Sequence, residues 1–382
     1  MPLSSLPQAA LALEDGTVYV GEPFGAETDV AAEVVFNTGI TGYQEVVTDP
    51  SYRGQMVVMT HPQIGNYGIA HSGDESVQPW VSALIVRELA DFSNHWESHS
   101  SLEDFLQQWN VPGLQGIDTR SLVRRLRDSG TQRGVLRQSG PGGFTSADLD
   151  ALRRAATQAP SVSQLELVSG VSHVLPSQGT GDIAVLDCGA KWNILRSLER
   201  RGVSPRVFDW DATAEDILAT KPRGILISNG PGDPAQLPTV VAELQKLVQS
   251  GTPVMGICLG HQLLGLAAGA TTSRLPYGHH GGNHPVRDLR SGTVTITTQN
   301  HEFQVVADTI PSSSGFEVSH VNLNDGSVEG LRHRELAVFS VQYHPEGCPG
   351  PQDSQRLFDD FLALAGADPR APTPDPRARS TT

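Results

Sequence analysis

Cysteine is scarce, and its spacing argues against two kinds of structural crosslink. The sequence has three cysteines, Cys188, Cys258 and Cys348, and none of them forms a C-x-x-C pair. An odd number of isolated cysteines argues against a disulfide framework and against a structural zinc site. We therefore expect no metal site and a protein of the reducing cytoplasm.

Long apolar runs and a leader segment are also missing. No apolar run approaches the roughly 20 residues that a membrane-spanning helix needs. The first residues, MPLSSLPQAALALEDG, lack a basic stretch followed by an apolar core. We therefore expect neither a membrane span nor a signal peptide.

Positive charge is limited. The 27 lysines and arginines face 42 acidic residues, which gives a net charge of −15. Binding to nucleic acid or to an anionic membrane needs a basic surface, so we expect neither partner. With 38% hydrophobic and 18% charged residues, the 382-residue chain has a globular composition. This length favours about two domains.

The first part of the chain alternates short apolar runs with turn residues. Within residues 1–140, VVF and QMVVM are strand-like pieces between Gly-, Thr-, Asp- and Pro-rich turns. One helix is expected after the capping residue Asp118, with Gly130 at its end. These patterns predict a smaller N-terminal domain of mixed α/β structure.

The second part has a different pattern. Residues 141–181 are expected to form a helix, capped by Thr145 and Asp148, and a linker. Residues 182–366 alternate continuous apolar strands with helices, which predicts a mostly parallel sheet flanked by helices. The expected strands are IAVLD, SPRVFDW, GILIS, PVMGI, TVTITT, FQVVA and AVFSVQYH. The Pro- and Arg-rich residues 367–382 are expected to be disordered.

Cys258 lies where the expected strand PVMGI meets the helix GHQLLGLAAGA. Gly256 and Gly260 would let the backbone turn sharply, which exposes the side chain at the edge of the sheet. The helix N-terminus favours a thiolate there and offers N–H groups to an oxyanion. From this turn alone, a nucleophile and a buried core thiol are both open interpretations.

A base and its partner stand in the segment QYHPEG. His344 precedes a proline, which favours an extended backbone, so His344 and Glu346 are expected to point to the same side. A thiol nucleophile needs such a base and a group that orients it. The glycine-rich turn SNGPGDP (228–234) lacks the P-loop pattern, and it could expose backbone N–H groups beside the cysteine.

Three motifs together resemble the class I, or triad, glutamine amidotransferases. SNGPGDP, GICLGHQ and HPE occur in the order and approximate spacing of that family, over about residues 182–365. The strings AEVVFNTGITGYQEVVTDPSY (32–52), IGNYG, IDTR and YGHHGGNHPV are similar to the small subunits of carbamoyl phosphate synthetases. The resemblance therefore runs nearly from end to end.

The resemblance implies roles for individual residues. It implies Cys258 as the nucleophile, His344 as general base and acid, and Glu346 as the group that orients the imidazole. Backbone N–H groups of Gly230 and Leu259 would form the oxyanion hole. Glutamine would be held by Ser51, Gly230, Gly232, Leu259, Gln262, Asn300, Glu302 and Phe303, with Ser51 contributed by the first domain.

One position departs from the family pattern. The segment QNHEF (299–303) has Glu302 where the family has glycine. A carboxylate aimed at the α-carboxylate of the substrate would weaken binding, so we expect the Glu302 side chain to face away. The histidines of GHHGGNH (278–284), including His280 and His284, have metal-ligand spacing only on a helix, and the glycines favour a structural loop or a subunit contact instead.

The resemblance also implies a partner. A large synthetase subunit would make carbamoyl phosphate, for arginine or pyrimidine synthesis, from bicarbonate, ATP and channelled ammonia. No cofactor is expected in this chain, and ATP and Mg²⁺ would bind the large subunit. The run GCPGP (347–351) is either part of the ammonia channel or a plain turn.

Three other functions stay open. The chain could be the amidotransferase subunit of another synthetase, such as those for anthranilate or GMP, although these lack the first 140 residues. It could be a cysteine peptidase or hydrolase on the same type of turn. It could also be a regulatory subunit without activity, although Cys258, His344 and Glu346 are all present.

Overall fold

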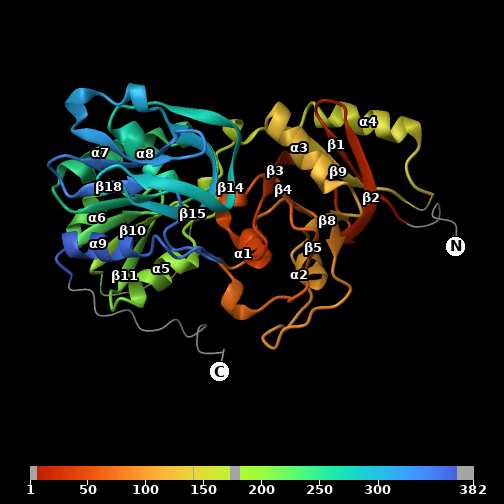
Figure 1. The fold of residues 1–382 in the computed structure, drawn as a ribbon, viewed down its shortest axis with the longest axis horizontal. Coiled ribbons are helices and arrows are strands. Elements are labelled where there is room, and N and C mark those ends of the chain that lie inside the picture. The colour runs from red at the N-terminus through yellow and green to blue at the C-terminus, as the bar shows by residue number, and fades with distance from the viewer. Residues whose placement is uncertain (1–6, 141, 173–180, 368–382) are drawn as a thin grey trace. The chain divides into compact units, whose positions relative to one another are not determined.

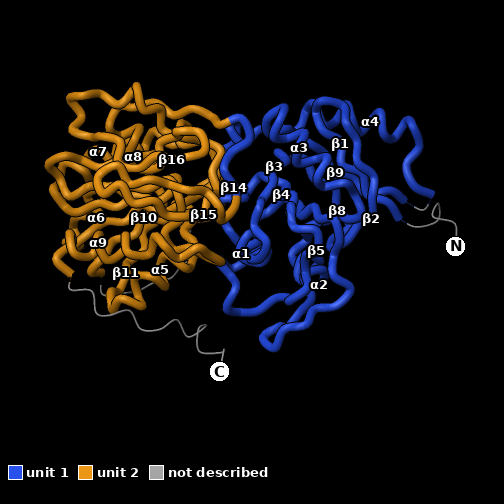
Figure 2. Tube along the Cα trace, in the orientation of Figure 1, with its two compact units in different colours: residues 1–165, 276–280 blue, residues 166–275, 281–382 orange. Residues whose placement is uncertain are grey.

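The computed structural model describes residues 7–140, 142–172 and 181–367. The chain divides into two compact units (Figure 2): unit 1 comprises Met1–Leu165 and Pro276–His280, and unit 2 comprises Glu166–Leu275 and Gly281–Thr382. In the described residues, no helix combines the length and apolar character needed to cross a membrane. The tail expected to be disordered, from residue 368 on, lies outside the described residues, as do residues 173–180 of the expected linker.

Unit 1 is built on a closed barrel of short strands (Figure 1). In barrel order the strands are β1 (Ala9–Leu13), β2 (Val18–Gly25), β8 (Pro112–Gln115), β6 (Ala83–Ile85), β4 (Gln55–Met59), β3 (Val30–Asn37) and β9 (Gln132–Gln138). A small parallel pair, β5 (Gln63–Ile64) and β7 (Glu88–Leu89), lies outside the barrel. Closure leaves no free strand edge, which explains how strands of three to eight residues form a stable sheet.

Both sides of strand β1 are buried, and its residues alternate between two cores. Leu11 packs in a cluster with Leu122 of helix α3 (Thr119–Ser129), while Ala10 packs with Leu152 of helix α4 (Ser146–Ala156). This alternation follows from the two-residue repeat of a strand. The apolar run AALAL is therefore buried along its whole length.

The helix boundaries predicted from capping residues are confirmed. The Asp118 side chain accepts a hydrogen bond from the backbone N–H of Ser121 at the start of α3, and Gly130 follows its end with φ 89°. A reciprocal capping box between Thr145 and Asp148 opens α4. Two shorter helices, α1 (Tyr43–Thr48) and α2 (Leu102–Gln108), complete unit 1.

Unit 2 contains a nine-stranded sheet that confirms the predicted α/β class. Its strand order is β11 (Pro205–Asp209), β10 (Ile183–Asp187), β12 (Gly224–Ile227), β13 (Val254–Ile257), β18 (Val338–Val341), β17 (Val328–His333), β16 (Phe316–Asn322), β14 (Thr272–Asp288) and β15 (Val294–Val305). The neighbouring strands β11, β10, β12, β13 and β18 pair in parallel. Strands β17, β16 and β14 then join by antiparallel pairing. The carboxyl ends of the parallel strands therefore meet at one edge.

Helices cover both faces of this sheet (Figure 1). One core includes side chains of α6 (Ala214–Ala219), α7 (Pro238–Gln249) and α8 (Leu259–Ala267). The other includes side chains of α5 (Trp192–Glu199) and α9 (Arg356–Leu364). Parallel strands buried on both faces need continuous apolar sequence, as IAVLD and GILIS have.

Two expectations about the later strands are wrong. The segment GHHGGNH lies within strand β14 and is not a loop. Its glycines have a weak preference for strands, so the strand forms because of pairing within the sheet. TVTITT and FQVVA are not separate strands but parts of the single strand β15. The residues QNHE between the two runs are polar yet buried. A search for apolar residues alone therefore divides this one strand into two.

Candidate active site

Cys258 stands at the junction of β13 and α8 with an unusual backbone. It is the N-cap residue of α8, and its φ of 54° and ψ of −104° lie outside the ordinary helix and strand regions. A non-glycine residue held in such a conformation costs on the order of 1–3 kcal/mol, and such strain clusters at functional sites. The sharp strand-to-helix turn that the sequence predicts is therefore present.

Close backbone packing surrounds this turn. A Cβ atom on Gly260 would lie 2.4 Å from the carbonyl oxygen of Ile227, the last residue of β12. A Cβ on Gly230 would lie 2.8 Å from Cδ2 of Leu259, so the turn SNGPGDP and the start of α8 are neighbours. Among the described residues, no hydrogen bond occupies the backbone N–H of Gly230 or Leu259. Their role as oxyanion donors stays a prediction.

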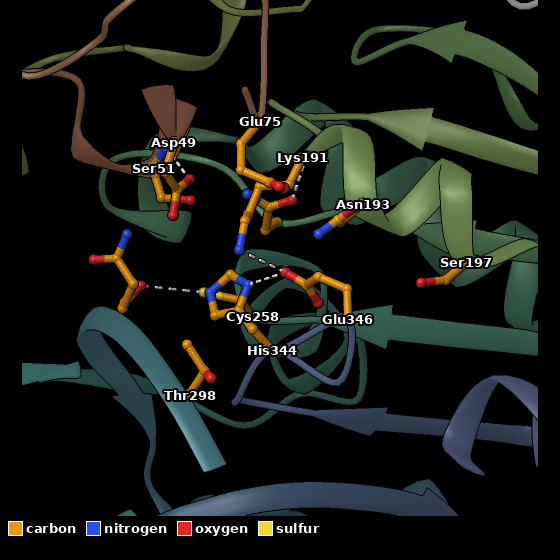
Figure 3. A network of polar contacts seen from close by, with 12 residues as sticks. Asp49, Ser51, Glu75, Lys191, Asn193, Ser197, Cys258, Thr298, His344 and Glu346 are labelled. Atoms are coloured by element: carbon orange, nitrogen blue, oxygen red, sulfur yellow. Dashed lines mark hydrogen bonds and ion pairs between the residues drawn. The ribbon is translucent and has the colours of Figure 1, made fainter. Parts of the chain in front are cut away.

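The base lies in a buried chain of charged groups. Nδ1 of His344 donates a hydrogen bond to Oε1 of Glu346 over 2.7 Å. The same oxygen lies 3.1 Å from Nζ of Lys191, and both side chains of this ion pair are almost fully buried. Figure 3 shows Lys191 and His344 converging on this carboxylate. The segment HPEG therefore brings the predicted base and its orienting group together.

Electrostatics favours charged forms at His344 and Glu346. Burial lowers the pKa of His344, but the charges of Glu346 and Cys258 outweigh burial and raise it well above its usual range. Burial raises the pKa of Glu346, but Lys191 and His344 outweigh burial and hold it well below its usual range. The pair is therefore an imidazolium and a carboxylate at neutral pH.

The sulfur of Cys258 is held within reach of this pair. Because Nδ1 of His344 is engaged by Glu346, Nε2 is the nitrogen left to face the sulfur of Cys258, which contributes to the raised pKa of the ring. Nε2 has no hydrogen-bond partner within the described part of the chain. The thiol donates to the carbonyl oxygen of Asn300 over 3.5 Å. Cys258 and His344 thus meet at the carboxyl edge of the sheet.

Two glutamines that support the cysteine are linked to each other. Nε2 of Gln342 donates to Sγ of Cys258 over 3.7 Å. Nε2 of Gln262, on α8, donates to Oε1 of Gln342 over 3.1 Å and to the carbonyl oxygen of Phe303 over 2.9 Å. This network connects α8, the end of β18 and the middle of β15 around the sulfur.

Glu302, predicted to line the glutamine site, has a buried carboxylate. Its Oε2 lies 3.0 Å from Nη2 of Arg274 on the other long strand, β14. Only 5% of its side chain is exposed. The carboxylate is therefore engaged by a cation, which agrees with the expectation that it faces away from substrate.

The other predicted glutamine-binding residues lie in separate local settings. Ser51 belongs to unit 1, in the short 3-10 helix Pro50–Tyr52, where its N–H donates to Oδ1 of Asp49 over 2.9 Å. Gly232 has φ 89° in the turn that follows β12. Asn300 and Phe303 are buried on β15. Their contacts with glutamine stay predictions.

Cys188 and two histidines of the segment GHHGGNH have local partners away from Cys258. Cys188 follows β10, and burial raises the pKa of its thiol far above its usual range. All three cysteines are free. The His280 ring stacks on Tyr52 with centroids 5.9 Å apart, and Asn322 Nδ2 donates to Nδ1 of His284 over 3.4 Å. His280 and His284 thus contact different residues.

Sequence patterns missed three residues of this site. Lys191 and Arg274 belong to no short motif, and Gln342 begins the segment QYHPEG without having been assigned a role. Lys191 carried one usable signal, because it follows the end of strand β10 at the same sheet edge as Cys258. Gln342 carried another, because it lies two residues before His344 in an extended segment. Arg274 carried none, since its partner Glu302 is distant in sequence.

The comparisons with known proteins cover both units. Residues 11–136 match the family described as carbamoyl-phosphate synthase small chain, CPSase domain, and residues 184–364 match glutamine amidotransferase class-I. The carbamoyl phosphate synthase small chain of Symbiobacterium thermophilum is 49% identical over 357 residues, which are 92% of this chain and 97% of that relative.

Two further relatives have similar coverage. The small chain of Bacillus caldolyticus is 45% identical, over 93% of this chain and 95% of the relative. The pyrimidine-specific small chain of Bacillus subtilis is also 45% identical, with the same two shares. The match of residues 11–136 excludes amidotransferases that lack this first domain. The chain therefore belongs to the carbamoyl phosphate synthase small chains, which carry a class I glutamine amidotransferase domain.

Proposed function

We propose that Cys258 attacks the side-chain amide of L-glutamine and forms a γ-glutamyl thioester. Family membership makes the protein the glutaminase subunit of a carbamoyl phosphate synthase. The observation that carries the assignment of the nucleophile is the position of Cys258 in a strained strand-to-helix turn, beside the ring of His344, whose pKa the sulfur helps to raise. A neighbouring imidazolium activates a cysteine by stabilising its thiolate.

His344 transfers the protons in this proposal. As an imidazolium beside the sulfur, it donates a proton to the leaving ammonia. The neutral ring then takes a proton from water as the oxygen attacks the thioester, and the Cys258 thiolate leaves beside the re-formed imidazolium. Glu346 keeps the ring in one tautomer, because its carboxylate accepts the Nδ1 proton. Lys191 keeps Glu346 ionised.

The negative charge that develops on the amide oxygen needs two donors. The free N–H groups of Gly230 and Leu259 are the proposed oxyanion hole. Removing one such donor typically costs on the order of 10²–10³ in kcat. Gly232, Gln262, Asn300, Glu302 and Phe303 are the proposed contacts for the rest of glutamine.

The ammonia is proposed to pass to a large synthetase subunit, which binds ATP and Mg²⁺ and makes carbamoyl phosphate. Membership of a small-chain family implies such a large-chain partner. The run 347–351 is a proposed part of the ammonia path, and the carbonyl oxygen of its Gly350 accepts a hydrogen bond from Thr298 over 2.7 Å. The three free cysteines favour a cytoplasmic protein.

The direct test compares the wild type with Cys258→Ala, each purified with the large subunit. The wild type should form carbamoyl phosphate from glutamine or from ammonia. Cys258→Ala should lose the glutamine-dependent reaction and keep the ammonia-dependent one. Appreciable ammonia release from glutamine by the variant would show that another group is the nucleophile.

A further inference from the structure

An ion pair between two strands lies in the segment that holds the nucleophile. Oε2 of Glu302 on β15 lies 3.0 Å from Nη2 and 3.3 Å from Nε of Arg274 on β14. The Arg274 guanidinium also lies over the ring of Phe303, 5.9 Å from its centroid. One arginine therefore contacts two successive side chains of β15.

The backbone around Glu302 contacts the catalytic groups. The carbonyl oxygen of Asn300 accepts a hydrogen bond from the Cys258 thiol. The carbonyl oxygen of Phe303 accepts hydrogen bonds from Gln262 over 2.9 Å and from the ring of His301 over 2.8 Å. Glu302 therefore lies between backbone atoms that contact the nucleophile and its helix.

The charge of Glu302 is unfavourable for the proposed substrate. Glutamine carries an α-carboxylate, and a like charge buried nearby repels it more strongly than it would in water. An ionised carboxylate with 5% of its side chain exposed also needs a counter-charge to be stable. Arg274 supplies that charge through two N–H groups, Nε and Nη2, that both contact Oε2 of Glu302.

We infer that Arg274 is a positioning residue that neutralises Glu302 and thereby allows this segment to accept an anionic amino acid. The inference rests on the proposed glutaminase function. Arg274 acts through Glu302 and Phe303, so its loss should weaken glutamine capture more than the chemical step. An ion pair that only held the two strands together would behave differently, because its loss would disturb Cys258 itself.

The test uses two reagents that attack the same thiol in the full-length chain, purified with its large subunit. One is 6-diazo-5-oxo-L-norleucine, a glutamine-shaped electrophile that carries the α-carboxylate. The other is iodoacetamide, which is neutral and needs no substrate site. The inference predicts that Arg274→Gln slows labelling by the charged reagent about tenfold, a loss of about 1.4 kcal/mol. Labelling by iodoacetamide should stay unchanged.

Companion variants identify the cause. Glu302→Gln in the Arg274→Gln background removes the carboxylate charge that Arg274 had neutralised and should restore most of the labelling rate. Arg274→Lys keeps the positive charge and should label within about threefold of the wild type. A lysine ammonium can still pair with Glu302, although it lacks the planar set of donors of a guanidinium. Glutamine turnover should show the same pattern as a raised KM with kcat within about twofold of the wild type.

A matched control is the Arg332–Glu317 ion pair, which joins β17 to β16 in the same sheet with both side chains partly exposed. Arg332→Gln should leave both labelling rates unchanged. Equal labelling of the wild type and Arg274→Gln by the charged reagent would overturn the inference. So would a slowing that the double variant does not relieve, or one that iodoacetamide shares. Failure of the charged reagent to label Cys258 in the wild type would instead contradict the proposed function.

Discussion

Oε1 of Glu346 lies 3.1 Å from Nζ of Lys191, and neither side chain has appreciable contact with solvent. The same oxygen accepts the hydrogen bond from His344. A carboxylate held in this way stays ionised in the interior, where burial alone would favour its neutral form. The proposed catalytic base, His344, is thus paired with a carboxylate that a second residue, Lys191, holds in place.

Lys191→Met should impair both catalysis and folding. Without the ammonium group, the pKa of Glu346 rises, so Glu346 takes up a proton at higher pH and stops orienting His344. The acid limb of the kcat/KM profile for glutamine should move to higher pH. Breaking a buried pair by removing one partner typically costs about 3–5 kcal/mol, and denaturant unfolding measures this cost.

The sign of the stability effect follows from the lowered pKa of Glu346. Its ionised form stabilises the native state above the ordinary carboxyl pKa, and this stability is lost as pH falls through the lowered value. The exposed Lys246, paired with Glu243 on α7, is a control whose change to Met should alter neither measurement. An unchanged acid limb in Lys191→Met would show that Lys191 does not set the ionisation of Glu346.

Gln342→Leu should reduce activity without unfolding the protein. The variant removes the amide N–H that donates to Sγ of Cys258 and keeps a similar side-chain volume. A hydrogen bond to a charged group is worth about 1.5–3 kcal/mol, so kcat should fall by roughly 10- to 100-fold. Stopped-flow iodoacetamide labelling of Cys258 should be slower in the variant, because the amide donor that orients the sulfur is missing. Identical labelling curves for the variant and the wild type would exclude a direct role of this donor.

His261 should limit stability in acid. The side chain is fully buried on α8, where its Nδ1 lies 2.9 Å from Oγ of Ser340, and burial lowers its pKa to about 3. The unfolded chain binds this proton near pH 6.5, while the native state resists it until about pH 3. Stability should therefore fall as pH drops through that window, by up to about 1.4 kcal/mol per pH unit from this group.

His261→Gln should flatten this dependence in denaturant titrations between the two pH values. Its stability at neutral pH should decrease, because a buried side chain is replaced by a different shape. The exposed His95 provides the control, and His95→Gln should keep the slope of the wild type. An unaltered slope in His261→Gln would assign the acid sensitivity to other groups.

Local sequence chemistry predicted much of this structure. The caps of α3 and α4, the alternating strands and helices of unit 2, and the turn at Cys258 all depend on contacts within a few residues. His344 and Glu346 are two residues apart, so their pairing also follows from backbone geometry. These features needed no knowledge of the distant parts of the fold.

Long-range pairing decided the features that the sequence did not predict. Barrel closure in unit 1 depends on β1 meeting β9, whose residues are remote in the chain. The Arg274–Glu302 pair and the Lys191–Glu346 pair each join residues from different strands or loops. Strand β14 was not predicted in full, because its glycines and histidines have a weak preference for strands. Pairing within the sheet overrides this preference.

The central claim is that the sulfur of Cys258 forms a covalent bond with the γ-carbonyl of glutamine. Acid quenching within the first turnovers, followed by mass spectrometry of proteolytic peptides, would detect this thioester. The account predicts a γ-glutamyl adduct on the peptide that contains Cys258. It also predicts more adduct in His344→Asn if acylation outpaces hydrolysis there, and none in Cys258→Ala. An adduct on Cys188 or Cys348, or glutamine hydrolysis that continues in Cys258→Ala, would contradict it.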